Sequence, residues 1–187
     1  MRTMLLCALL AVCAACGGGN PTFATGTATV SAPINGVTMT PQDAISVVFQ
    51  SGSNSLAEVF ISSFPTACSK INAHQEPRNS QAVVIALSNR TSPTAIVAPS
   101  VTGDYPVYLA TDHSHIGVQA SLQFLVTDQN CVLVTQLDAS AGTVTLTRID
   151  ANGYAGTYNV TFGTSTVTGS FSSAQCAPLA NPTTNCI

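Results

Sequence analysis

The second half of the chain alternates regularly between apolar and polar residues. The clearest example is residues 117–126, where five apolar positions (Val118, Ala120, Leu122, Phe124 and Val126) alternate with Gln119, Ser121 and Gln123. The same two-residue period recurs in 153–162 and 165–172. Because successive side chains of a strand point to opposite faces, this period predicts strands with one buried and one solvated face.

Short turn signals separate these stretches. Asn152-Gly153 is the strongest hairpin dipeptide of the chain, and Asp128-Gln129-Asn130, Ser140-Ala141-Gly142 and Gly163-Thr164 also suit tight reversals. The combined pattern predicts a meander of strands, at residues 117–127, 131–138, 142–150, 153–162 and 165–172.

The first half has a different pattern. Asn35-Gly36, between 27–31 and 37–40, predicts another hairpin. Three further segments, 44–49, 57–62 and 82–88, are apolar almost throughout, as expected for strands that are covered on both faces.

Two short helices are predicted in this half. Thr40-Pro41-Gln42-Asp43 resembles a capping box with proline at the first helical position, so a helical turn is expected after it. Residues 65–73 form the second candidate, with Ala67, Cys68 and Ile71 on one side. We therefore expect an all-β fold, an antiparallel β-sandwich or closed barrel of about 8–10 strands with one or two short helices.

The beginning of the chain has the pattern of an export signal. Residues 4–16 form an apolar run that follows Arg2. This run is shorter than the ~20 residues that a membrane-spanning helix needs. A short apolar region behind a positive start is typical of a secretory signal peptide.

The end of this run resembles a known processing site. Cys13-Ala14-Ala15-Cys16 is similar to the lipobox of bacterial lipoproteins, although that family most often has leucine where Cys13 stands. The resemblance implies cleavage before Cys16 and lipidation of its thiol, so membrane contact is expected through this anchor. Glycine after the cysteine implies sorting to the outer membrane, facing the periplasm or the cell surface. The expected organisation is a signal peptide at 1–15, a lipidated flexible tether at 16–24 and a single β domain at 25–187.

The remaining cysteines indicate disulfides. Cys68, Cys131, Cys176 and Cys186 form an even set, which suits two disulfides in an oxidising compartment. Three pairings are possible. We expect Cys176 to pair with Cys186 across a short loop, and Cys68 to pair with Cys131.

Charge excludes one class of partner. Only 7% of the residues are charged, and without the leader four basic residues (Lys70, Arg78, Arg90 and Arg148) stand against eight acidic ones. Nucleic-acid binding requires several phosphates to be neutralised by lysine or arginine. Four scattered cations are poorly suited to this, so no nucleic acid is expected as a partner.

One cluster has metal-ligating chemistry. In Asp112-His113-Ser114-His115 the two histidines are two residues apart, which on a strand places them on the same face. His74 or Glu76 would complete a three-ligand site with His113 and His115. The alternative interpretation is a solvated turn before the strand at 117–127.

Catalytic patterns are not evident in the sequence. There is no Gly-x-Ser-x-Gly motif, and the mature cysteines are explained by disulfides. The scattered acidic residues form no suggestive pair for glycoside hydrolysis. Enzyme activity and a cofactor are therefore not expected.

The final strands resemble a group of known proteins. The run AGTVTLTRIDANGYAGTYNVTFGTSTVTGSFSSAQCAP is similar to the closing module of uncharacterised β-rich lipoproteins of Gram-negative bacteria, and VTMTPQDAIS near the start is similar to the same group. The resemblance implies a disulfide-bearing β domain on a lipid anchor. We expect a non-catalytic binding or structural module of the cell envelope, with a protein, a glycan or a small apolar molecule as ligand. The alternative is a metal-binding or metal-dependent hydrolytic envelope protein that uses His113 and His115.

Overall fold

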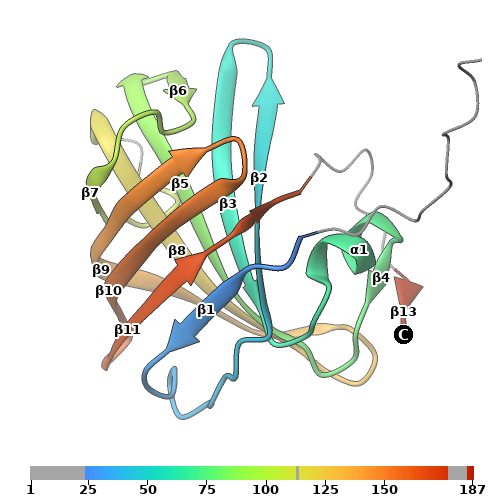
Figure 1. Cartoon of the computed structure of the whole chain (residues 1–187). Helices are drawn as coiled ribbons and strands as arrows, with labels where there is room; N and C mark the ends of the chain where they lie inside the picture. Colours follow the sequence, from blue (N-terminus) through green and yellow to red (C-terminus); the bar gives the residue numbers. More distant parts are fainter. Residues whose placement is uncertain (1–23, 113, 177–184) are drawn as a thin grey trace, which may run out of the picture.

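The computed structural model describes residues 24–112, 114–176 and 185–187. Strands dominate it, and they form a curled, mostly antiparallel sheet with the shape of a half-barrel (Figure 1). The elements in chain order are β1 (Thr27–Val30), β2 (Asp43–Ser51), β3 (Asn54–Ser62), α1 (Ala67–Asn72), β4 (Gln75–Glu76), β5 (Gln81–Ser92), β6 (Ala95–Val97), β7 (Gly103–Pro106), β8 (Gly117–Thr127), β9 (Leu133–Asp150), β10 (Gly153–Phe162), β11 (Ser165–Ser172), β12 (Ala174–Gln175) and β13 (Asn185–Cys186).

The main sheet contains eleven of these strands. Its order is β1-β11-β10-β9-β8-β5-β3-β2-β12, with β6 added beside β5 and β7 beside β9. The first part of β9 pairs with β8, and its second part pairs with β10 and β7. This one long strand therefore belongs to both halves of the sheet and carries its curvature from one half to the other (Figure 1).

The two ends of the sheet approach each other near the start of β2. After β11 the chain continues through Ser173 into β12, which pairs in parallel with β2 at Ile45 and Ser46. Just before β1, the backbone N–H of Gly26 donates to the carboxylate of Asp43 at 2.9 Å. These contacts connect β1 and β12 to β2 at one end of the half-barrel.

Two apolar clusters stabilise the fold. The larger lies inside the curled sheet, and its largest fully buried side chains include Tyr105, Phe124, Phe162, Ile85 and Leu122. The smaller lies on the opposite face of β2, where α1 covers it; its members are Ile45, Val47, Phe64, Ala67, Cys68 and Cys176. The second cluster explains why residues 44–49 and 57–62 lack a regular polar alternation, because parts of both their faces are covered.

The meander is confirmed in most of its predicted strands. β8, β10 and β11 have the expected bounds. The predicted turn at Ser140-Ala141-Gly142 is wrong, because β9 runs through these residues without interruption. Gly142 has a φ of +131°, and the pairing of β9 with β10 shifts register beside it. The glycine thus marks an irregularity inside a strand, a role that a turn signal does not distinguish from a reversal.

The predictions for the first half are confirmed in part. Asn35-Gly36 forms a turn with positive φ at both residues, but only Ile34 and Val37 pair across it. β1 pairs instead with β11. The helix expected at 65–73 is α1, whereas the helical turn expected after Asp43 is wrong, because β2 begins at this residue.

The four expected cysteines form two disulfides, but the expected pairing is wrong. Cys68 of α1 bonds to Cys176, just after β12, with a Cα–Cα distance of 5.7 Å. Cys131, in the turn between β8 and β9, bonds to Cys186 of β13 with a Cα–Cα distance of 5.6 Å. Proximity along the chain favoured Cys176 with Cys186, but the parallel pairing of β12 with β2 carries Cys176 to the helix.

The predicted signal peptide and the lipidated Cys16 lie outside the described residues. Within the part of the chain that the structure describes, no helix is long and apolar enough to span a membrane.

Candidate functional site

A groove lies on the outer face of β3, β5 and β8, on the side opposite the main core. Its volume is about 250 Å³. The floor consists of side chains that alternate with the core residues of these strands: Leu56, Glu58, Val84, Ala86, Ser88, Arg90, Gln119, Ser121 and Gln123. The walls come from Ile96 of β6 and from the segment between β7 and β8, with Tyr108, Leu109, Ala110 and Asp112.

The register of the three strands places the polar groups of the floor side by side. Glu58 is opposite Ala86, and Ala86 is opposite Ser121. Neighbouring strands are about 4.8 Å apart, so the Cα atoms of Glu58 and Ser121 are separated by about 10 Å. The carboxyl and the hydroxyl therefore face the groove from both sides of a small methyl group.

Two glutamines extend this polar floor along β8. Gln119 donates from Nε2 to the hydroxyl of Ser88 at 3.4 Å, and Gln123 donates to Oδ1 of Asp138 at 2.8 Å. These bonds cross between strands and hold both amides along the floor of the groove.

Glu58 is the most unusual group in the groove. Burial raises the pKa of its carboxyl above the ordinary value, because desolvation disfavours the charged form. Its neighbours across the strands are Val47 and Ala86, which offer no side-chain donor. The carboxyl makes no hydrogen bond or ion pair with any residue of the described ranges. A half-buried acceptor of this kind favours a ligand that brings its own donors.

Arg90 stands at the far end of the groove. Its side chain is only 8% exposed, and Nη1 donates to the carbonyl of Pro93 at 3.1 Å. From the strand rise and spacing, its Cα lies about 14 Å from that of Glu58. The groove therefore contains opposite charges at two separate positions.

The segment that carries the predicted metal ligands forms the rim of this groove. His115 stacks on Tyr108 with a ring-centroid distance of 3.7 Å, and its Nε2 lies 3.2 Å from Oδ2 of Asp112. The other oxygen of Asp112 accepts from both the hydroxyl and the backbone N–H of Ser114. These bonds, that of the Ser114 hydroxyl first, lower the pKa of Asp112. The rim is thus a solvent-exposed turn held by its own side chains.

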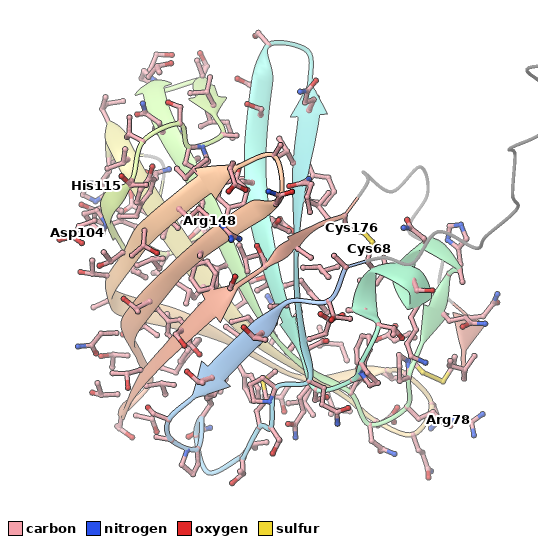
Figure 2. All side chains as sticks on the ribbon, viewed as in Figure 1. Cys68, Arg78, Asp104, His115, Arg148 and Cys176 are labelled. Atoms are coloured by element: carbon pink, nitrogen blue, oxygen red, sulfur yellow. A yellow bond between two sulfur atoms is a disulfide. The ribbon has the colours of Figure 1, made fainter. Side chains whose placement is uncertain are left out.

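His74 and His115, two of the three candidate metal ligands, lie far apart (Figure 2). His74 lies between α1 and β4, on the other side of the molecule from His115 (Figures 1 and 2). His113 lies outside the described residues. Among the residues that the structure does describe, no three histidine, cysteine or acidic side chains are close enough to hold a metal ion.

The groove presents polar groups that suit the binding of a ligand. Among its serines, Ser88 is hydrogen-bonded to the amide of Gln119, which cannot act as a general base. Amides, hydroxyls and an unpaired carboxyl are the groups that proteins use to bind hydroxyl-bearing ligands, and Tyr108 adds an aromatic ring beside them.

Sequence reasoning missed most of these residues. Glu58 and Arg90 lie in or just beyond stretches that were interpreted only as doubly covered strands. A charged side chain inside an apolar segment is the signal that could have identified them. Gln119 and Gln123 were recognised as the solvated face of their strand, but nothing in the alternation indicates that β6 and the Tyr108 segment enclose that face.

Comparison with known proteins adds no relative. No family model, no curated protein and no solved structure matches this chain. A functional proposal therefore depends on the leader, the disulfides and the groove.

Proposed function

We propose that this chain is a lipid-anchored, non-catalytic binding module of the bacterial cell envelope, and that it binds a small hydroxyl-rich ligand, a glycan unit, in the outer-face groove. The observation that carries the proposal is the half-buried carboxyl of Glu58, which lies in the groove without a hydrogen-bond or ion-pair partner among the residues that the structure describes. Ligand hydroxyls would donate to this carboxyl and would exchange further hydrogen bonds with the amides of β8.

The two disulfides support the proposed location in the cell envelope. Disulfides persist in oxidising environments such as the periplasm and the cell surface. The short apolar leader and the lipobox-like Cys13-Ala14-Ala15-Cys16 support export and anchoring on the outer membrane.

The fold is proposed to be of the barrel type rather than a sandwich, because β9 passes through both halves of the sheet.

Ligand binding is tested with an array of bacterial mono- to tetrasaccharides. We expect the wild-type protein to bind at least one glycan, and Glu58→Gln to weaken that binding at least tenfold, since the amide replaces one acceptor oxygen with a donor. Asp104→Asn is the matched control, because Asp104 is an exposed carboxylate outside the groove. Equal binding by the wild type and Glu58→Gln would contradict the proposed site, and absence of any glycan binding would contradict the ligand class.

The anchor is tested by metabolic labelling with radioactive palmitate. Wild-type protein and Cys7→Ser, which changes a cysteine of the leader, should both incorporate the label and remain with the membrane. Cys16→Ser should lose both properties. Full labelling of Cys16→Ser would show that the anchor is elsewhere.

A further inference from the structure

Among the described residues, a second surface of the molecule exposes apolar side chains. Val132, Leu133, Val134 and Ile187 are each about half exposed, at 45–58% of their full accessibility. They form one region, because Cys131 is bonded to Cys186 and the turn from β8 to β9 therefore lies beside β13 (Figure 1). We call these four residues the apolar patch.

The patch continues into an apolar hollow. A groove of about 200 Å³ adjoins Leu133, and Phe60, Ala82 and Leu125 contribute to its lining. Exposed apolar residues scattered singly are ordinary in proteins, but neighbouring ones that extend into a groove mark a surface that contacts a partner or a membrane.

The chain enters the fold on the same side of the molecule. The N–H of Gly26 binds the carboxylate of Asp43, and the same carboxylate accepts from the N–H of Ala67, the first residue of α1. α1 leads to β4, and β4 pairs with β13, whose Cys186 is joined to the residue before Val132. The entry point and the apolar patch are thus connected by a short series of adjacent elements.

The length of the tether sets how far the domain can be from the bilayer. Seven residues lie between Cys16 and Ala24, which makes eight Cα–Cα intervals, and a fully extended chain spans at most about 3.6 Å per residue. Ala24 can therefore be no more than about 29 Å from an anchored Cys16. An anchored domain with this tether has its α1–β13 side within reach of the membrane surface.

The charged residues on this side of the molecule balance one another. Lys70 and Arg78 lie on it, and Glu76 and Asp128 balance them, so the region offers no net charge for attraction to an anionic partner.

We infer that the apolar patch lies against the lipid bilayer that holds Cys16, so that β13 and the β8–β9 turn face the membrane and the Tyr108 wall of the groove lies at the far end of the same sheet face. This inference depends on the lipid anchor of the proposed function. His115, on the rim of the groove, and Arg78, next to Ile187, lie on opposite sides of the molecule (Figure 2).

The chain offers a clean test because it contains no tryptophan. Leu133→Trp places a single fluorophore in the patch, and Leu109→Trp places one beside the groove. The two leucines are matched in exposure, at 48% and 47%. Val134→Trp is a second probe of the patch. The full acylated proteins are reconstituted in phosphatidylethanolamine–phosphatidylglycerol vesicles that contain brominated phosphatidylcholine.

Membrane contact should distinguish the probes. Tryptophan at 133 and at 134 should emit at shorter wavelength and lose at least half of its intensity to the brominated lipid, whereas tryptophan at 109 should be quenched only by aqueous iodide. High salt should leave this difference unchanged, because the contact is apolar. Similar water exposure of all three probes would overturn the inference.

Two other outcomes overturn the inference in distinguishable ways. Emission at shorter wavelength without quenching by brominated lipid, together with chemical cross-linking of dimers, would show that a second copy covers the patch. Absence of palmitate from the purified protein would remove the anchor and, with it, this orientation. Palmitate incorporation with water-exposed probes at 133 and 134 would leave the anchor intact and refute the orientation alone.

Discussion

The carboxylate of Asp43, at the start of β2, accepts a hydrogen bond from the backbone N–H of Ala67 at 2.8 Å. Its other oxygen accepts from the N–H groups of Gly26 and Ala44 at 2.9 and 2.8 Å. Asp43 is only 1% exposed. One side chain thus joins the segment before β1, the second residue of β2 and the first residue of α1.

We expect Asp43→Asn to destabilise the protein strongly. The amide keeps one acceptor oxygen, but its NH₂ would face an N–H donor, so at least one buried donor would lose its partner. Hydrogen bonds to a buried charged group contribute about 1.5–3 kcal/mol each, and a loss of about 2–4 kcal/mol in the free energy of unfolding is expected. Urea unfolding with intact disulfides measures it. Asp104→Asn, on the exposed surface, should change the stability by less than about 0.5 kcal/mol. Equal effects of the two substitutions would contradict the role of Asp43.

The disulfide pairing predicts a specific tryptic pattern. Cleavage after Lys70, Arg78, Arg90 and Arg148 places Cys68 and Cys131 in separate peptides and leaves Cys176 and Cys186 together in 149–187. With Cys68 bonded to Cys176 and Cys131 bonded to Cys186, these three peptides should migrate as one linked species until reduction.

Mass spectrometry of the unreduced digest checks this pattern. A free peptide 149–187 with an internal disulfide would contradict it, and would restore the pairing expected from proximity in the sequence. Further cleavage after Leu179 separates Cys176 from Cys186 and shows which partner each one retains. In the chain-entropy model, loops of this size contribute roughly 4–5 kcal/mol each, so reduction should lower the melting temperature markedly.

The strands of the second half were predictable because each buries one face only. In β10, Tyr158, Val160 and Phe162 are buried while Thr157 and Asn159 are exposed, so the sequence pattern and the burial agree. The first half was less predictable, because α1 covers part of the outer face and removes the alternation. Asp43 shows this limit most clearly. The helix-capping pattern predicts that its carboxylate accepts hydrogen bonds from backbone N–H groups, and it does. The helix whose N–H it accepts is α1, however, whose first residue lies 24 residues further along the chain.

The candidate site was much less predictable than the strands. The segment Asp112–His115 was predicted to concentrate polar chemistry, and two of its residues lie at the groove, because Asp112 lines it and His115 stacks on Tyr108 in its wall. The floor could not be foreseen, because the antiparallel pairing of β3, β5 and β8 aligns Glu58, Ala86 and Ser121 from three distant parts of the sequence. Register between strands is a property of the whole sheet, and no local pattern encodes it.

Close packing around Gly169 gives a further prediction. A Cβ at this position of β11 would collide with the carbonyl oxygen of Thr29 and with the ring of Tyr158, whose hydroxyl donates to that same carbonyl at 2.9 Å. Gly169→Ala should therefore destabilise the fold by about 1–3 kcal/mol, as overpacking usually does. Thermal unfolding measures it, with Thr166→Ala on the exposed face of the same strand as the control. A melting temperature of Gly169→Ala equal to that of the control would contradict this packing.

The buried carboxyl of Glu58 makes stability depend on pH. Burial raises its pKa in the folded state above the value in the unfolded chain, so the folded protein holds this proton more tightly. Between the two pKa values the folded state binds more protons, and stability must fall as pH rises through this window. Above this pH window, the charged carboxylate lowers the free energy of unfolding by a constant amount. Glu58→Gln removes this titration, so the variant should gain stability over the wild type at pH 7 and lose that advantage near pH 4. Urea unfolding of both proteins at the two pH values measures the difference. The same stability gap at pH 4 and pH 7 would show that Glu58 titrates alike in the folded and unfolded states.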